Sequence, residues 1–208
     1  MCIMLRVKGR RACFSRPELK VEAVSYDVMT PTAARAIVGC IYWKPQIEWV
    51  VDGILVLNPI RTAVIKQNLI DDKISAKAVA RGSQKPFDVT SMRDQRNSTI
   101  LIDVDYIIKA HFDIVSGEDN TGKHLDMFMR RAEKGQCFRH PYFGCRDFSV
   151  DSFELIQSMP LSQFKGIKPL GYMLHSIDYT TNKPAFWDAQ LSNGYLSVPL
   201  ATSKEVKR

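Results

Sequence analysis

The sequence predicts an α+β fold, in which an antiparallel sheet carries two helices, from three observations. Residues 99–115 alternate apolar and polar side chains, as in a strand with one buried face. Residues 31–43 and 123–134 each carry an apolar stripe at helical spacing. Strand-like segments precede, separate and follow these helices. The order β–α–β–β–α–β with further strands behind it is the ferredoxin-like arrangement with an appended small antiparallel sheet.

The first half of the chain supplies two strands of this sheet. Residues 3–7 predict a strand that ends at Lys8-Gly9, and residues 10–27 predict a loop rich in charge. The apolar run over 47–60 predicts a longer strand, in which Gly53 marks a bulge.

The first helix has the clearest start in the sequence. Thr30 is a favourable N-cap, and Pro31 fits the first helical position, where its missing N–H costs nothing. The residue before Pro45 disfavours helical backbone, so the helix ends there and Tyr42 falls in its last turn. Its apolar stripe consists of Ala33, Ala34, Ile37 and Ile41.

The second half of the chain begins with residues 68–98, which are polar and mixed and predict an excursion from the core. The second helix carries the stripe Leu125, Phe128, Met129 and Ala132 and ends before Gly135. Further strands are expected at 136–143, 146–156, 172–179 and 186–198. We therefore expect a ferredoxin-like domain over residues 1–150 and a C-terminal antiparallel β-sheet extension over residues 151–208.

The composition excludes several classes of protein. An apolar share of 45% in 208 residues is too high for a disordered chain. The most apolar run, residues 47–57, is broken by charges and a glycine, which excludes a membrane-spanning helix. Residues 1–11 lack the apolar core of a secretory signal. Five cysteines without a Cys-x-x-Cys pair indicate a reducing, cytoplasmic location.

The charge balance points to a polyanionic partner. Lys and Arg number 29 and Asp and Glu 22, which gives a net charge of +7. A basic surface of this kind is commonly used to neutralise phosphates.

Cofactor and metal motifs are missing from the sequence. It contains no P-loop, dinucleotide fingerprint, His-Glu-x-x-His or Gly-x-Ser-x-Gly, so we expect no cofactor and no bound metal. The carboxylate pairs Asp71-Asp72 and Asp103 with Asp105 fit a loop and the solvent face of a strand.

Gly122-Lys123-His124 is the strongest candidate for chemistry, because it begins the second helix. Helix N-termini attract anions, and an ammonium and an imidazole add a charge and a proton-transfer group. The alternative is a solvated helix start. In a ferredoxin-like fold the two helices pack side by side, so Tyr42 can join this site; otherwise it is a core residue. His111 and His140 fit ordinary surface positions.

If Tyr42, Lys123 and His124 converge, they are best suited to RNA cleavage without metal. The RNA 2′-hydroxyl is a built-in nucleophile, so the protein needs only to move protons and stabilise the crowded phosphorane. DNA lacks that hydroxyl and could not be cut in this way.

Several segments along nearly the whole chain resemble one protein family. They are FSRPE at 14–18, SYDVMTP at 25–31, IYWKP at 41–45, LNPI at 57–60, RDQR at 93–96, GKH at 122–124, YFGCRDF at 142–148 and GYML at 171–174. In this order they resemble the CRISPR-associated Cas family five, variant d, of type I-C (Dvulg) systems, within the RAMP superfamily.

This resemblance implies a ferredoxin-like, RRM-type domain with a small C-terminal sheet. It implies a metal-independent endoribonuclease that cuts CRISPR precursor RNA at the base of each repeat hairpin. The enzyme would retain the 5′ handle of the mature guide and join the backbone and large subunits of the type I-C interference complex. The family's catalytic residues fall on Tyr42, Lys123 and His124.

The resemblance leaves other questions to the structure. Position 36 is alanine where glycine is more familiar, and only Gly166 and Gly171 are candidates for the superfamily's glycine-rich loop. Two alternatives stay open: a non-catalytic subunit that holds the 5′ handle, and a general binder that also takes duplex DNA. We expect RNA contacts from Arg16, Lys20, Arg93, Arg96, Arg130, Arg139 and Arg146.

Overall fold

The strands of the described chain join into one sheet. The computed structural model describes residues 2–70, 73–83, 88–115 and 120–207. Within these residues the sheet has nine strands in the order β6-β1-β5-β3-β9-β8-β7, with β2 and β4 also paired to β5. Only the β2–β5 pair is parallel among these described strands, so an α+β fold with a mostly antiparallel sheet is confirmed.

The elements are β1 Ile3–Ala12, β2 Ala23–Val24, α1 Pro31–Ile41, β3 Ile47–Val56, β4 Thr62–Ile70, α2 Ala76–Ala80, β5 Arg93–Ile114, α3 Thr121–Glu133, β6 Ser152–Leu155, β7 Ile167–Asp178, β8 Lys183–Ser192 and β9 Tyr195–Ser197.

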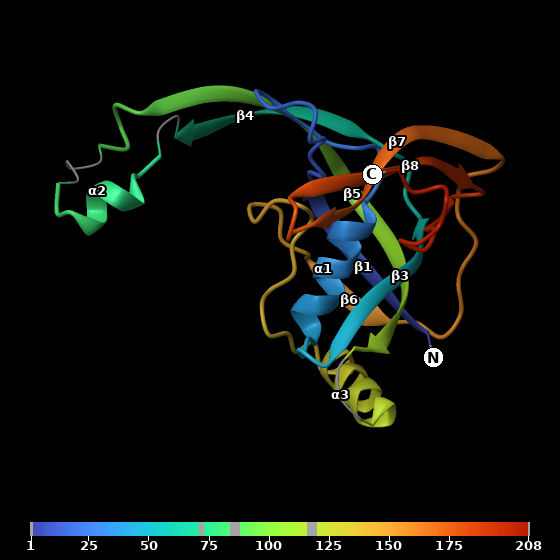
Figure 1. The fold of residues 1–208 in the computed structure, drawn as a ribbon. Helices are drawn as coiled ribbons and strands as arrows, with labels where there is room; N and C mark the ends of the chain where they lie inside the picture. The colour runs from blue at the N-terminus through green and yellow to red at the C-terminus, as the bar shows by residue number, and fades with distance from the viewer. Residues whose placement is uncertain (1, 71–72, 84–87, 116–119, 208) are drawn as a thin grey trace.

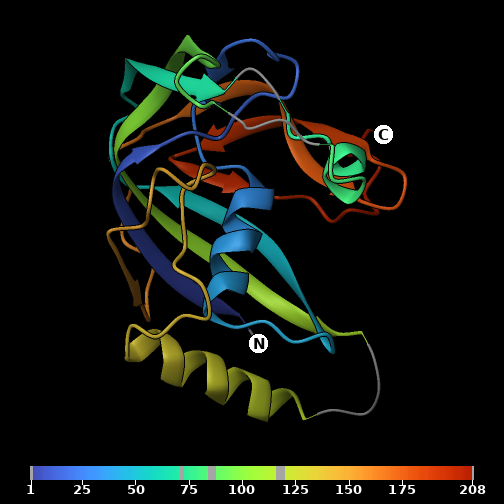
Figure 2. The same cartoon turned by 90° about the vertical axis from the view of Figure 1, so that its left-hand side faces the viewer.

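The two longer helices lie differently on this sheet. α1 covers one face, whereas α3 lies across the end of that face instead of beside α1 (Figures 1 and 2). Thr30 starts α1 as predicted, because its side chain accepts a hydrogen bond from the Ala33 N–H. The helix ends at Ile41, so Tyr42 is its C-cap with extended backbone and not part of the last turn.

β4 and the outer half of β5 form an arm that projects from the body and leads to α2 (Figure 1). The described residues between 68 and 98 therefore do leave the core, but not as an irregular segment throughout. β4 reaches Ile70, and β5 begins opposite it at Arg93. The alternation over 99–115 marks only the inner part of this strand, because the outer residues pair with β4 without a buried face.

The first strand is longer than predicted. β1 continues through Lys8 and Gly9 to Ala12. A glycine fits inside this strand because the Phe143 ring lies against it; a Cβ at Gly9 would stand 2.5 Å from Phe143 Cε2. The glycine here marks a close side-chain approach and not a strand end.

The segment after α3 contains less strand than predicted. Residues 136–143 form none, and within 146–156 only β6 does. Gly144 turns the chain with φ 79°, and a Cβ there would stand 2.0 Å from the Cys13 carbonyl oxygen. The chain therefore packs here as a tight loop against the end of β1, where the backbone of Cys13 already donates to the Phe143 carbonyl.

One of the expected solvent-facing carboxylates is buried. Asp105 accepts two hydrogen bonds from the Arg6 guanidinium, at 3.0 and 2.8 Å, and is 6% exposed. Asp103 is exposed as expected and pairs with Arg61 at 2.7 Å. Asp71 and Asp72 lie outside the described residues.

The C-terminal strands extend the same sheet at both edges. β6 pairs with β1 at one edge, and β9, β8 and β7 follow β3 at the other. The strand expected at 172–179 is thus confirmed as β7, whereas the single strand expected at 186–198 is instead two paired strands, β8 and β9, joined by a turn at 193–194. None of the helices in the described ranges is long and apolar enough to cross a membrane.

Candidate active site

The fold brings the end of α1 to the start of α3. The Tyr42 hydroxyl and His124 Nδ1 lie 2.8 Å apart, within hydrogen-bond distance, although 82 positions separate the two residues. Their ring centroids are 5.9 Å apart. An imidazole and a phenol in this contact can exchange a proton with each other or with a bound group.

Several contacts hold Tyr42 at the end of α1. Its backbone N–H donates to the Val38 carbonyl, and its own carbonyl accepts from Trp49 Nε1 at 2.8 Å. Arg131 of α3 lies over the Tyr42 ring, with Cζ 5.3 Å from the centroid. The same guanidinium donates to the Ile41 carbonyl at 3.1 Å, so it ties α3 to α1 and keeps a positive charge beside the phenol.

His124 is held in the first turn of α3. Asn120 caps this helix, because its side chain accepts hydrogen bonds from the Gly122 and Lys123 N–H groups at 2.9 and 3.4 Å. The imidazole packs against Phe112 of β5, with ring centroids 6.1 Å apart. Beneath it, edge and tilted ring contacts join Trp49, Phe112 and Phe128.

The Tyr42–His124 pair is buried. Each residue is 2% exposed, so the alternative of a solvated helix start is wrong for His124. Lys123, its neighbour in the chain, is exposed. The geometry thus places an ammonium group at the surface and a phenol–imidazole hydrogen bond below it. A hydrogen bond shielded from water is stronger than an exposed one.

A groove of about 750 Å³ lies along α1 and reaches Trp43, the residue after Tyr42. Its walls come from α1, the first half of β3, the end of β7 and residues 198–201. Tyr42 and His124 do not line it. The groove and the buried pair are therefore neighbouring but separate features, which meet at the end of α1.

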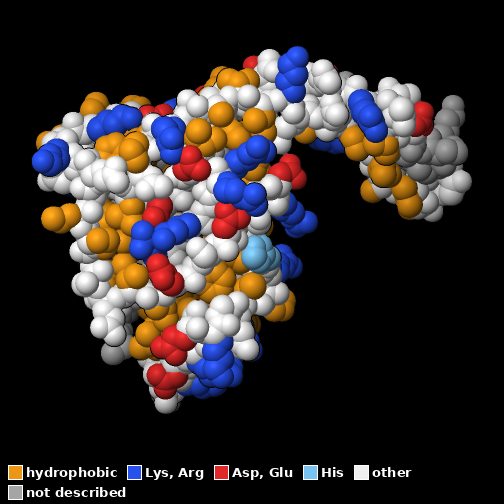
Figure 3. Space-filling view, turned by 180° about the vertical axis from the view of Figure 1, so that it is seen from behind, with side chains coloured by type: hydrophobic (Ala, Val, Ile, Leu, Met, Phe, Trp, Pro, Cys, Tyr) orange, Lys and Arg blue, Asp and Glu red, His pale blue; other side chains and the backbone are white. Residues whose placement is uncertain are grey.

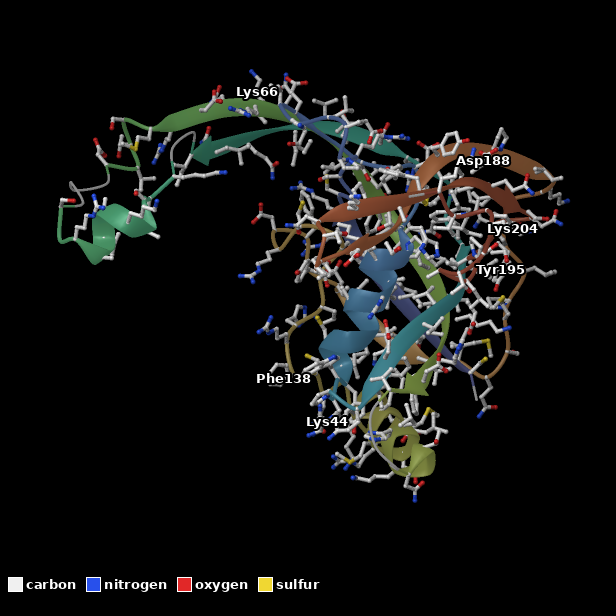
Figure 4. The ribbon with its side chains drawn as sticks, viewed as in Figure 1. Lys44, Lys66, Phe138, Asp188, Tyr195 and Lys204 are labelled. Atoms are coloured by element: carbon white, nitrogen blue, oxygen red, sulfur yellow. The ribbon has the colours of Figure 1, made fainter. Side chains whose placement is uncertain are left out.

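Exposed aromatic side chains line this groove. Trp43, Phe138 and Tyr179 are 60%, 74% and 81% exposed. Figure 4 places Phe138 and Lys44 beside the lower end of α1, close to α3. Arg139 also lines the groove, with its Cζ 5.8 Å from the Phe138 ring centroid. Aromatic rings beside arginines are typical of surfaces that bind single-stranded nucleic acid.

The basic residues expected at RNA are not gathered in one place. Arg139 lines the groove, and Arg130 is exposed on α3. Lys20, Arg93 and Arg146 are exposed elsewhere. On the face seen in Figure 3, Lys and Arg side chains are interspersed with Asp and Glu, so that face carries no continuous basic patch.

Arg16 and Arg96 have structural partners. Arg16 lies over the Tyr26 ring, 4.5 Å from its centroid. Arg96 bonds to Asp94 and donates to the Val21 carbonyl at 3.2 Å. Both side chains help to hold the loop before β2 against the body and the start of β5.

Sequence reasoning missed Arg131 and the groove aromatics. Arg131 stands seven positions after His124, which is about two helical turns, so helical spacing could have placed both on one face. Phe138 lies in an irregular segment and Tyr179 in a turn after β7, where no periodic pattern indicates which element they approach.

Comparisons with known proteins agree with this architecture. The family described as CRISPR-associated protein (Cas_Cas5), type Cas5d, matches residues 2–199. A protein of Mannheimia succiniciproducens named CRISPR pre-crRNA endoribonuclease Cas5d is 46% identical, over 99% of this chain and 98% of its own. A Thermus thermophilus protein of the same name is 32% identical, over 99% of this chain and 95% of its own.

Solved structures share the fold. One titled "Crystal Structure of CRISPR-associated Protein" superposes with a TM-score of 0.76 at 24% identity and covers 100% of this chain and 97% of its own. A functionally uncharacterised Streptococcus mutans protein gives a TM-score of 0.70 at 22% identity, with the same coverage.

Replacing Tyr42 with phenylalanine tests the buried contact directly. Tyr42→Phe removes the hydroxyl and deprives the buried His124 of this hydrogen bond, so the free energy of unfolding should fall by about 1–3 kcal/mol. Tyr179→Phe is the matched control; because Tyr179 is 81% exposed, its change should stay within about 0.5 kcal/mol. Urea unfolding measures both. Equal, small effects would mean that the contact does not form in solution.

Proposed function

This chain belongs to the Cas5d family of CRISPR-associated proteins, and we propose that it is an endoribonuclease that cuts CRISPR precursor RNA at the base of the repeat hairpin. Two relatives that match it over nearly their full length carry the name pre-crRNA endoribonuclease. The observation that carries the proposal is the hydrogen bond between Tyr42 and His124, with Lys123 next to it in the chain.

The chemistry that fits this pair is an attack by the RNA 2′-hydroxyl on the adjacent phosphorus. The 2′-oxygen forms the new P–O bond as a base removes its proton, and the bond to the 5′-oxygen breaks as an acid supplies a proton. His124 and Tyr42 share these two transfers. The products are a 2′,3′-cyclic phosphate and a 5′-hydroxyl, and no step requires a metal ion.

Positive charge beside the pair stabilises the reacting phosphate. The Lys123 ammonium neutralises charge that develops on the non-bridging oxygens of the phosphorane. Arg131 lies over the Tyr42 ring, where its charge favours a phenol that is losing its proton. Its bond to the Ile41 carbonyl keeps it there, so Arg131 positions the phenol and has no need to touch the RNA.

Burial of the pair implies that RNA binding opens the site. A phosphate reaches the two rings only if the first turn of α3 moves, because both residues are 2% exposed. Helix ends are the part of a helix that frays most readily. We propose that Lys123, which is exposed on this turn, meets the phosphate first and that the turn then shifts to admit it.

The groove along α1 is the proposed track for the single-stranded RNA beside the hairpin, including the 5′ handle that the protein retains. Trp43 would stack a base within one residue of Tyr42, and Arg139 would pair with a phosphate. Arg16, Lys20, Arg93, Arg96, Arg130 and Arg146 are proposed as further contacts to the RNA backbone. Other subunits of a type I-C interference complex are the proposed protein partners.

We further propose that β1, α1, β3, β5, α3 and β6 form the ferredoxin-like domain. The order β6-β1-β5-β3 with antiparallel neighbours supports this, as do the helices between β1 and β3 and between β5 and β6. The division into residues 1–150 and 151–208 stays a proposal. With this division, β6 at Ser152–Leu155 would belong to the second segment of the chain but would form the last strand of the first domain's sheet.

A second candidate is a scaffold subunit that holds the 5′ handle without cutting RNA. The burial of Tyr42 and His124 favours it, because a tightly packed pair can serve structure alone. The face in Figure 3 offers duplex DNA no continuous basic surface, because its charges are mixed. Cleavage of the repeat hairpin separates the two candidates.

Single substitutions test the enzyme. His124→Ala should lower the cleavage rate about 100- to 10,000-fold, because a proton-transfer group is lost. Lys123→Ala should lower it at least about 100-fold, because an electrostatic stabiliser is lost. Hairpin affinity should change little in His124→Ala and should fall in Lys123→Ala only by the loss of one phosphate contact. Gel assays in EDTA measure the rate, and filter binding measures the affinity.

Matched controls are Lys134→Ala, an exposed lysine at the other end of α3, and His140→Ala, an exposed histidine. Both should cut RNA at the wild-type rate. If His124→Ala lost hairpin affinity to the same extent as cleavage rate, His124 would only contact the RNA and would take no part in the reaction. Cleavage that requires Mg²⁺, or that survives a 2′-deoxy substitution at the cut site, would refute the mechanism.

The groove makes a separate prediction about binding. Trp43→Ala and Phe138→Ala should each weaken binding of the single-stranded flank by about 1–3 kcal/mol, the usual value of one stacked base. Tyr172→Ala is the control, because Tyr172 is an exposed aromatic that does not line the groove. Fluorescence anisotropy with a labelled flank measures all three. Equal losses in the control would show that the groove is not the RNA track.

A further inference from the structure

The sheet face opposite α1 carries three potential metal ligands at one place. Ala110 of β5 pairs with Ile3 of β1 on one side and with Val51 of β3 on the other. All three side chains are buried in the core on the α1 side of the sheet. The residue next to each of them therefore points to the other face. These neighbours are Cys2, Asp52 and His111, and one donor atom from each lies within 4.8 Å of the other two.

We propose that Cys2, Asp52 and His111 bind a zinc-type divalent cation that links β1, β3 and β5. The His111 Nδ1 atom is 2.8 Å from Asp52 Oδ1, and the Cys2 Sγ atom is 3.6 Å from Asp52 Oδ2. The three donors thus already face a common point. This site is separate from the proposed RNA chemistry and does not depend on it.

The chemistry of the donors selects the ion. Sulfur, imidazole nitrogen and carboxylate oxygen are the ligands of Zn²⁺ and Co²⁺, whereas Mg²⁺ and Ca²⁺ take oxygen alone. A thiolate and a carboxylate together carry two negative charges and balance a dication. Binding releases the Cys2 thiol proton, and the imidazole proton of His111 moves from Nδ1 to Nε2 so that Nδ1 can coordinate the ion. Three protein ligands leave a fourth tetrahedral position for water.

The surroundings support the three ligands. His111 Nε2 lies 3.8 Å from Asp113 Oδ1, so a small turn of the ring lets it donate there and leaves Nδ1 for the metal. The register between β3 and β5 shifts between Val51 and Gly53, which marks a β-bulge. A β-bulge redirects the side chain at its centre, which here is Asp52.

Tyr195 closes one side of the cluster. Its hydroxyl lies against Gly53, where a Cβ would stand 2.0 Å from it. Figure 4 shows this residue on the C-terminal strands, away from the arm.

Cobalt titration of the full chain, stripped with a chelator and dialysed, tests this proposal. Co²⁺ should bind one equivalent per chain and give a thiolate-to-cobalt charge-transfer absorption band, which Zn²⁺ should abolish by displacement. Cys2→Ala should lose the band completely. Because Cys2 is exposed, this variant should fold and cut RNA like the wild type. Asp113→Asn should weaken Co²⁺ binding about 10-fold, as loss of an outer-shell partner does.

Cys137→Ala is the matched control, because it removes a partly exposed thiol outside the cluster, and it should keep the band. A wild-type protein without the band would overturn the proposal. So would a band that persists in Cys2→Ala or disappears in Cys137→Ala, because the thiolate would then come from elsewhere.

Discussion

The contact between the Tyr42 hydroxyl and the His124 imidazole is the constraint on which the proposed activity depends. It joins the end of α1 to the start of α3, which lies across the end of the sheet instead of beside α1 (Figure 2). Trp49 holds the backbone of Tyr42 from β3, and Arg131 holds the end of α1 from α3. Hydrogen bonds to the backbone carbonyls of Ile41 and Tyr42 therefore help to position the pair, in addition to the hydrogen bond between the two side chains.

In the proposed function, burial places RNA binding and RNA cleavage in separate parts of the protein. The groove along α1 would present its exposed rings to the RNA, whereas the proposed reacting pair lies below the surface at the end of the groove. A shielded pair keeps water from the phosphate and strengthens each electrostatic contact, but it demands a movement before the reaction. The first turn of α3, capped by Asn120 and bearing Lys123, is the element whose displacement would uncover both rings.

Local sequence signals predicted the position of several helices and strands. Pairing between distant segments determined the features that were not predicted. Thr30 and Pro31 predicted the start of α1, and the alternation over 99–115 predicted the inner half of β5. The excursion from the core was predicted, but its strands were missed, because they are stabilised by each other and have no buried face. Tyr42 and His124 were named as candidates because a helix start and a helix end are visible in sequence, and the structure brings the two side chains within 2.8 Å of each other. Their burial was not predictable, because it comes from α3 lying across the sheet end and from Phe112 beneath it.

Coupling between the two rings is the most direct test of this account. Single-turnover cleavage of the repeat hairpin in chelator should be measured for Tyr42→Phe, His124→Ala and the double variant. If the two side chains act as one proton-transfer unit, the double variant should cut no more slowly than His124→Ala alone. Rate losses that multiply would mean that the two residues act independently and that their hydrogen bond serves only the fold.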